Sequence, residues 1–184
     1  MARKLGLREF HQQVLKRLES AVSAEATRAS RLGFEIAGEN WLVDLASISE
    51  VIPVPEHVPV PLTHAWFRGV ANVRGNLYGL VDFSAFLGKG PTAAGLEVRA
   101  LLVHPKFGVN AGLLVRRVHG LRNPEEFHPA QPGEPGPWTL AHWADAEGGQ
   151  WKELDVESLA RHPEFLNISL YRRVDVVAAA AHPL

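Results

Sequence analysis

The stretch WFRGVANVRGNLYGLVDF, residues 66–83, decides how the rest of the chain is interpreted. Two apolar and β-branched runs flank Arg74-Gly75-Asn76. Gly and Asn readily supply the positive backbone angles that a tight hairpin turn needs. The stretch therefore predicts two antiparallel strands joined by a short turn.

The side chains near that turn are unusual for a strand. Because successive side chains point to opposite faces, Asn72 and Arg74 are expected to share one face, opposite Ala71 and Val73. A guanidinium beside an amide is a poor filling for a core, since a buried charge is costly unless it is paired. Arg74 alone would indicate only a solvated charge at a turn, but with Asn72 it favours a surface that docks a partner.

Composition limits the classes of protein to consider. The chain has 184 residues and a hydrophobic content of 46%, enough for one domain with a substantial core. It has no cysteine, which excludes disulfides and thiolate metal sites and is compatible with a reducing cytoplasm. No apolar run is long enough to span a membrane, and the N-terminus lacks the apolar segment of a secretory signal. We therefore expect a cytoplasmic protein without membrane insertion.

The charge is small overall but uneven along the chain. The formal net charge of −1 argues against a general nucleic-acid binder, which needs a basic surface to neutralise phosphates. Residues 1–31 hold seven Lys and Arg against three Glu, or +4, whereas residues 32–184 hold twelve against seventeen, or −5. An OB-like nucleic-acid-binding barrel remains the alternative, and it would need its aromatic side chains in a basic groove.

The basic N-terminal segment, residues 1–31, is expected to form an amphipathic helix. Its apolar side chains recur at helical spacing: Leu7, Phe10, Val14, Leu18 and Val22. Docking of this stripe on the protein's own barrel is the preferred interpretation. A partner-binding helix and a membrane-surface helix with its cations at the lipid headgroups are the other two.

From residue 33 onward the pattern changes to that of strands. Residues 34–45 predict a hairpin, and residues 47–52 a strand that places Ile48 and Glu50 on one face if it stays extended. The prolines of residues 53–61 exclude a helix or a central strand and indicate a crossover arch rather than a polyproline ligand.

The second half continues in the same manner. Near-continuous apolar runs at residues 98–104 and 111–118 predict strands buried on both faces. The Gly and Pro residues of 120–137 predict a long loop, after which residues 138–154 predict a last hairpin. Asp155 can cap a short helix that reaches Leu159.

The chain offers little for catalysis. Its nine histidines are scattered without the spacing of metal ligands, and no Gly-x-Ser-x-Gly nucleophile turn occurs. Glu125-Glu126 lies in the stretch rich in Gly and Pro, where two carboxylates suit solvent better than acid/base work. The segment Gly88–Thr92 lacks the spacing of a phosphate-binding loop and is expected to be a flexible surface loop. We expect no enzyme, no cofactor and no metal; a metal-dependent hydrolase is the weakest of the alternatives.

The central stretch resembles a family signature. Phe67-x-Gly69-Val70-x-Asn72-x-Arg74-Gly75 followed by Leu80-Val81-Asp82 is similar to the pattern "GV-N-(L/V)-RG, then a hydrophobic strand ending in D" of the CheW-like coupling proteins of bacterial chemosensory systems. Pro59-x-Pro61 resembles the proline pair that leads into this signature. Near the end, Gln150-Trp151-x-Glu153-Leu154-Asp155 is similar to the PilI-like adaptors of type IV pilus twitching motility.

The resemblance implies a fold. Strand pattern alone allows a sandwich, an OB-like barrel or SH3-like barrels. The resemblance selects a mainly β fold of two intertwined five-stranded SH3-like barrels, with an N-terminal amphipathic helix and a short C-terminal helix. It divides the chain into an N-terminal helical extension (1–31), a CheW-like domain (32–170) and a C-terminal tail (171–184).

The resemblance also implies a function. The family's role is that of a non-enzymatic scaffold, which couples the cytoplasmic tip of a methyl-accepting chemoreceptor to a CheA-type histidine kinase of a two-component system. It implies a place at the inner membrane face, through receptor arrays, and a role in twitching motility. Receptor contact is carried over to Ile48, Glu50, Asn72 and Arg74. Arg116, which stands where the family commonly has an acid, and Gly79, where proline is frequent, depart from the pattern.

Overall fold

The structure is a computed structural model that describes residues 31–131 and 136–170 of the chain. The predicted N-terminal helix and the tail 171–184 lie outside the described residues. Strands predominate, which confirms the mainly β prediction. They form two sheets, one of five strands as expected and one of six. The expectation of five strands is wrong for the second sheet, because Phe127–Pro129, within the predicted loop, adds an edge strand.

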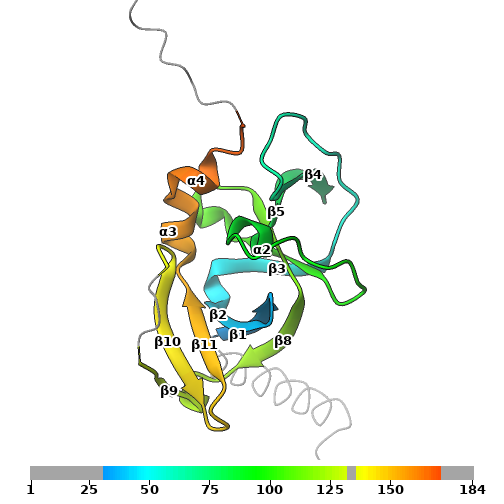
Figure 1. The fold of residues 1–184 in the computed structure, drawn as a ribbon. Coiled ribbons are helices and arrows are strands. Elements are labelled where there is room, and N and C mark those ends of the chain that lie inside the picture. Colours follow the sequence, from blue (N-terminus) through cyan, green and yellow to red (C-terminus); the bar gives the residue numbers. More distant parts are fainter. Residues whose placement is uncertain (1–30, 132–135, 171–184) are drawn as a thin grey trace, which may run out of the picture.

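The six-stranded sheet lies at the lower end of Figure 1. Its spatial order is β8-β1-β2-β11-β10-β9, and only the β2–β11 pair is parallel. The strands are β1 (Arg31–Ile36), β2 (Glu39–Asp44), β8 (Arg117–Arg122), β9 (Phe127–Pro129), β10 (Thr139–Asp145) and β11 (Gln150–Leu154).

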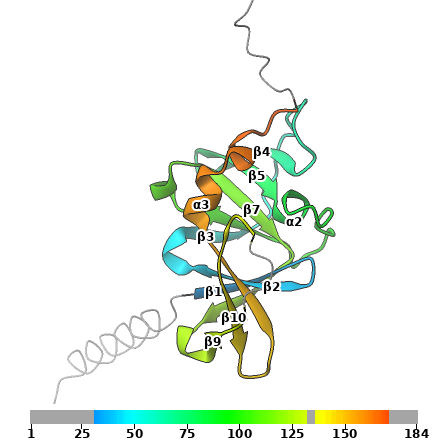
Figure 2. The same cartoon turned by 60° about the vertical axis from the view of Figure 1, so that its left-hand side comes forward.

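The five-stranded sheet lies above it, and Figure 2 shows the same stacking from another side. Its spatial order is β3-β6-β7-β5-β4, and here only the β5–β7 pair is parallel. The strands are β3 (Ile48–Pro53), β4 (Phe67–Val73), β5 (Asn76–Asp82), β6 (Arg99–Val103) and β7 (Ala111–Val115).

The chain connects the two sheets twice. It leaves the six-stranded sheet after β2, builds the whole five-stranded sheet, and returns from β7 directly into β8. Arg116 is the residue between these two strands, and its amide donates to the carbonyl of Glu35 at 2.9 Å. The predicted strand 111–118 is therefore two strands, one in each sheet.

The long loop predicted for residues 120–137 is wrong in its first half. Strand β8 continues to Arg122, a 3₁₀ turn, η3 (Pro124–Glu126), follows, and β9 pairs with β10. Proline is tolerated there because β9 is an edge strand, where the missing N–H leaves no partner strand unsatisfied.

Apolar side chains fill both faces of the five-stranded sheet. One face packs against the six-stranded sheet and contributes Val81, Leu101, Leu113 and Val115 to the core shared by the two sheets. The opposite face is buried as well and carries Tyr78, Leu80, Ala100, Leu102 and Leu114. This double burial explains the near-continuous apolar runs of β6 and β7, and it confirms that prediction.

Short helices close the ends of the sheets. The elements are η1 (Leu45–Ser47), α2 (Phe83–Phe86), η2 (Pro105–Phe107), α3 (Val156–Arg161) and α4 (Pro163–Leu166). Asp155 caps α3 as predicted, because its Oδ1 accepts from the Ser158 amide at 2.9 Å. Leu159 and Phe165 then pack into the shared core. None of the helices in residues 31–131 and 136–170 is long and apolar enough to cross a membrane.

The proline-rich arch between β3 and β4 is fastened to β4 and, further along, to residues 168–170. Val58 and Val70 exchange two backbone hydrogen bonds of 2.9 Å. Beneath the arch, Gly69 has φ +132°, and a Cβ there would lie 2.2 Å from the Val58 carbonyl oxygen. The glycine of the signature is thus required by the close approach of the arch.

Candidate partner-binding site

The turn between β4 and β5 determines where Arg74 lies. Arg74 and Gly75 have φ of +52° and +87°, and Val73 pairs with Asn76. These are the two positive angles of a two-residue hairpin turn. The prediction that Gly75 and Asn76 supply these angles is therefore wrong by one residue. Arg74 itself occupies the turn instead of continuing the strand face of Asn72.

Asn72 stabilises that turn. Its Oδ1 accepts a hydrogen bond of 2.8 Å from the Gly75 amide, as an Asx side chain does when it replaces a backbone acceptor. This interaction fixes the chain direction on both sides of Arg74. The Asn72 side chain stays exposed, so it remains available for the contact predicted from the sequence.

Arg74 and Glu50 form a forked ion pair. The Arg74 Nη1 donates to Glu50 Oε2 at 2.8 Å, and Nη2 donates to Oε1 at 2.7 Å. The Arg74 side chain is 76% exposed and that of Glu50 is 31% exposed. Two of the four predicted site residues are thus brought together across a sequence separation of 24 residues.

This pair joins the two edges of the five-stranded sheet. Glu50 lies on the edge strand β3, whereas Arg74 lies in the hairpin that forms the opposite edge. An exposed ion pair adds only about 0–1 kcal/mol to stability. A planar guanidinium held by both carboxylate oxygens is nevertheless fixed in orientation, and its outer side remains open to a partner.

Ile48 lies elsewhere, because β3 contains a bulge. Ile48 pairs with Val103 and Glu50 with Leu102, so Ser49 is the extra residue. Val103 and Leu102 are neighbours on β6 and point to opposite faces of the sheet. Their partners Ile48 and Glu50 therefore lie on opposite faces too. The expectation that the two share a face is therefore wrong. Ile48 is 7% exposed and belongs to the core between the sheets, so its predicted receptor contact has little surface.

Two exposed aliphatic residues near the ion pair were not singled out from the sequence. Leu77 lies directly opposite Asn72 in the hairpin and is 61% exposed. Val51 is also 37% exposed on β3, but it pairs with Leu101 whereas Glu50 pairs with Leu102, so Val51 points to the face opposite to Glu50. The alternation of β5, in which Tyr78 is buried, was the signal that would have placed Leu77 on the outer face.

The acid that ends the signature has a structural role. Asp82 is 2% exposed and caps α2 by accepting from the Ala85 amide at 3.3 Å. It also accepts from the Thr92 amide at 2.9 Å and the Thr92 hydroxyl at 2.7 Å. The loop that follows α2 is therefore fastened to β5 at Thr92.

Other charged side chains connect distant segments. Arg116, the departure from the family pattern, lies 3.5 Å from the Glu97 carboxylate. Glu39 binds Lys89 at 2.6 Å and Lys152 at 3.0 Å. Burial acts to raise the pKa of Glu39, but the hydrogen bonds from both lysines outweigh it and the pKa is lowered. These contacts leave the carboxylate charged.

The exposed groups near the β4–β5 turn have the composition of a protein-binding surface. Within the part of the chain that the structure describes, no group of His, Asp and Glu could hold a metal ion. The exposed groups around Arg74 are one forked ion pair, the amide of Asn72 and the aliphatic side chain of Leu77. Such a mixture is typical of a protein-binding surface, where an Arg anchor is flanked by apolar contacts.

The chain is similar to known proteins in sequence and in fold. The family model described as "CheW-like domain" matches residues 31–164. The protein PilI of Pseudomonas aeruginosa is 29% identical over 164 residues, which cover 86% of this chain and 92% of PilI. The scaffolding protein TtCheW of Thermoanaerobacter tengcongensis has a similar solved structure, with a TM-score of 0.58, 21% identity, and coverage of 67% of this chain and 86% of that one.

Proposed function

Because this chain belongs to the CheW-like domain family, we propose that it is a non-enzymatic adaptor that couples a methyl-accepting chemoreceptor to a CheA-type histidine kinase. The observation that carries the proposal is the forked ion pair between Arg74 and Glu50. It lies on the family signature and leaves the guanidinium 76% exposed. The receptor's cytoplasmic tip is the partner assigned to this surface.

The proposed receptor surface contains the residues carried over from the family, in different roles. Arg74 is the direct contact, Glu50 orients its guanidinium, and Asn72 holds the turn while adding an exposed amide. Ile48 supports β3 from the core side. Leu77, which pairs with Asn72, adds apolar area beside the turn.

The mechanism follows from coupled binding. An adaptor that contacts both receptor and kinase transmits a signal when its contacts differ between two arrangements of the complex. The adaptor itself needs no chemistry, only a rigid surface that holds the kinase's regulatory domain beside the receptor tip. The double burial of the five-stranded sheet gives that surface a stiff support.

The relationship to PilI favours a particular pathway. We assign the chain to the chemosensory control of type IV pilus twitching motility, because the likeness extends over 92% of PilI. The place of action is then the cytoplasm, at the inner membrane face, where receptor arrays recruit the adaptor. A flagellar pathway is the competing assignment, and binding to a pilus-type receptor tip distinguishes the two.

The finer architecture belongs to the same proposal. Each sheet is assigned as an SH3-like barrel, and residues 32–170 as one folding unit. Two observations support closure of the five-stranded sheet: both its faces are buried, and the Arg74–Glu50 pair connects its edges. Residues 168–170 bond to residues 62–64, which supports a boundary near 170.

The test is co-sedimentation of the adaptor with a pilus-type receptor tip and a CheA-type kinase. Wild type should form a ternary complex, and Arg74→Glu should lose the receptor while retaining its fold. Arg161→Glu is the matched control, because Arg161 also forms an exposed ion pair, 2.8 Å from Glu157 with its side chain 77% exposed.

Several outcomes would overturn the proposal. An Arg74→Glu variant that binds the receptor as tightly as wild type would remove Arg74 from the interface. Failure of wild type to bind either partner would reject the adaptor role. In that case, salt-dependent binding of oligonucleotides would support the OB-like barrel instead.

A further inference from the structure

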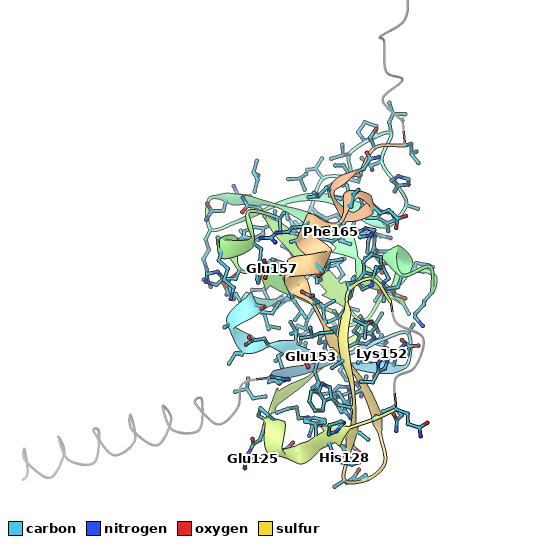
Figure 3. The ribbon with its side chains drawn as sticks, turned by 90° about the vertical axis from the view of Figure 1, so that its left-hand side faces the viewer. Glu125, His128, Lys152, Glu153, Glu157 and Phe165 are labelled. Carbon is cyan, nitrogen blue, oxygen red and sulfur yellow. The ribbon has the colours of Figure 1, made fainter. Side chains whose placement is uncertain are left out.

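A groove of about 650 Å³ opens between the six-stranded sheet, η1, η2 and α3. Figure 3 looks onto this side of the molecule, with Glu157 on α3 above Glu153 on β11. The volume lies within the range of protein pockets that accept a ligand or several side chains. The groove does not include Arg74 or Glu50, so it is separate from the proposed receptor surface.

The groove is partly apolar. Phe107, Leu140, Leu154 and Val156 line it, and Leu140 is 63% exposed. Leu154 and Val156 are each 3% exposed and belong to the shared core. An exposed leucine beside an apolar lining forms an apolar patch, and such patches are typical of surfaces that bind another apolar surface.

The border of the groove is acidic on balance. Among its lining residues, Arg31 is paired with Glu153 at 3.0 Å and Arg161 with Glu157 at 2.8 Å. Asp44 also lines the groove and accepts from the Ala46 amide at 2.9 Å. Asp155 accepts from Ser158 instead, through both the amide and the hydroxyl. Among the described residues, neither Asp44 nor Asp155 forms an ion pair. Of the three cations that line the groove, Lys106 is the one that pairs with no carboxylate of the described residues, so two unpaired negative charges face one positive charge.

We propose that residues 7–22 of this same chain, as an amphipathic helix, occupy the groove. The N-terminal segment joins the described chain at Arg31, which itself lines the groove. From Val22 to Arg31 the chain is nine residues long and reaches up to about 30 Å when extended. The apolar stripe is therefore within reach of Leu140.

The charges of the two surfaces are complementary. Residues 7–22 hold three cations (Arg8, Lys16 and Arg17) against Glu9 and Glu19, or +1. The groove lining holds four carboxylates against three cations, or −1. On a helix that turns about 100° per residue, Arg8 and Arg17 fall on the two borders of the apolar stripe, and Lys16 falls opposite it. The stripe thus matches the apolar lining, and its bordering arginines match Asp44 and Asp155.

The test uses the full chain, which has no cysteine of its own. Spin labels on Gln12→Cys, on the polar side of the helix, and on Ala46→Cys, beside the groove, report one distance by double electron–electron resonance. In the chain that carries only these two labels, the background variant, we expect a narrow distribution of the distance between them. Leu140→Ser or Val14→Asp should abolish the narrow peak, because each removes an apolar contact.

Matched controls separate docking from general effects. Leu121→Ser changes another leucine, 54% exposed on β8 and outside the groove, and should leave the peak unchanged. Lys16→Ser should also leave it unchanged. Asp44→Asn retains an η1 cap but removes a charge, so it should broaden the peak.

Two results would overturn the proposal. One is a broad distribution in the background variant that Leu140→Ser does not alter. The other is a narrow peak that disappears when the labelled chain is diluted with unlabelled chain, which would assign the groove to a second copy. Neither result depends on receptor or kinase binding, so the adaptor function stands or falls separately.

Discussion

Arg74 and Glu50 hold each other through two hydrogen bonds of 2.8 and 2.7 Å, although they come from opposite edges of the five-stranded sheet. Arg74 is 76% exposed in this arrangement. The pair is too exposed to be explained as a stabilising contact, since such pairs add about 0–1 kcal/mol. The proposed role in receptor recognition would account for its fixed geometry.

The first prediction is a double-mutant cycle on this pair. Arg74→Gln and Glu50→Gln, alone and together, should show a coupling energy in urea unfolding below about 1 kcal/mol. For binding of the receptor tip, measured by calorimetry, Arg74→Gln should lose roughly 2–5 kcal/mol, because the interface desolvates the charge. A larger coupling in stability than in binding would contradict the recognition role.

Local pattern was sufficient for the elements around this pair but not for the pair itself. Alternation and turn residues predicted the β4–β5 hairpin, and an Asp cap predicted the helix that begins after Asp155. The contact between Glu50 and Arg74 depends on how far the five-stranded sheet curves, because that curvature brings its two edge strands together. Such curvature arises from tertiary packing, so it cannot be read from spacing.

The bulge at Ser49 shows a second limit. A single extra residue in β3 puts Ile48 into the shared core and turns Glu50 to the other face. Ser, Ile and Glu carry no local signal for a bulge, whereas a glycine would have suggested one. Similarly, the prolines near β9 predicted a loop, because an edge strand that tolerates proline is recognised only once the sheet order is known.

The second prediction concerns the close approach at Gly69. A Cβ there would lie 2.2 Å from the Val58 carbonyl oxygen, and two backbone hydrogen bonds hold Val58 against Val70. Gly69→Ala should destabilise the fold by about 3 kcal/mol or more. Gly75→Ala is the control: φ is also positive, but nothing lies within 4 Å, so about 1–2 kcal/mol is expected. Equal losses in guanidinium unfolding would show that the arch yields easily.

The third prediction concerns the buried acid of the signature. Asp82→Ala removes the cap of α2 and both hydrogen bonds to Thr92, and should lower stability by roughly 2–4 kcal/mol. Asp155→Ala removes a more exposed cap and should lower stability by about 1 kcal/mol. Hydrogen exchange at Thr92 should accelerate only in the Asp82 variant. Protection of Thr92 that survives Asp82→Ala would mean that the loop is held by other contacts.

The last prediction concerns pH. Burial lowers the pKa of His119 from its usual value of 6.5, and repulsion from Arg117 and Arg122 lowers it further, against the attraction of Glu35. The unfolded chain therefore binds a proton more readily than the folded one. The stability that depends on a neutral His119 is therefore fully present above pH 6.5, the pKa in the unfolded chain. It is lost as the pH falls through the lower pKa of the folded chain.

Thermal unfolding should accordingly show a fall in Tm as the pH drops from 6.5 to 4.5. The window ends at pH 4.5 because this is the usual pKa of Glu39, and the lowered pKa of Glu39 makes its own contribution to stability change only below that pH. His119→Gln should flatten this part of the profile, because it removes the group that must bind a proton beside Trp151, at 5.6 Å between ring centroids. His128→Gln, an exposed histidine on β9, should leave the slope as it is. A slope that persists in His119→Gln would assign the acid sensitivity to carboxylates instead.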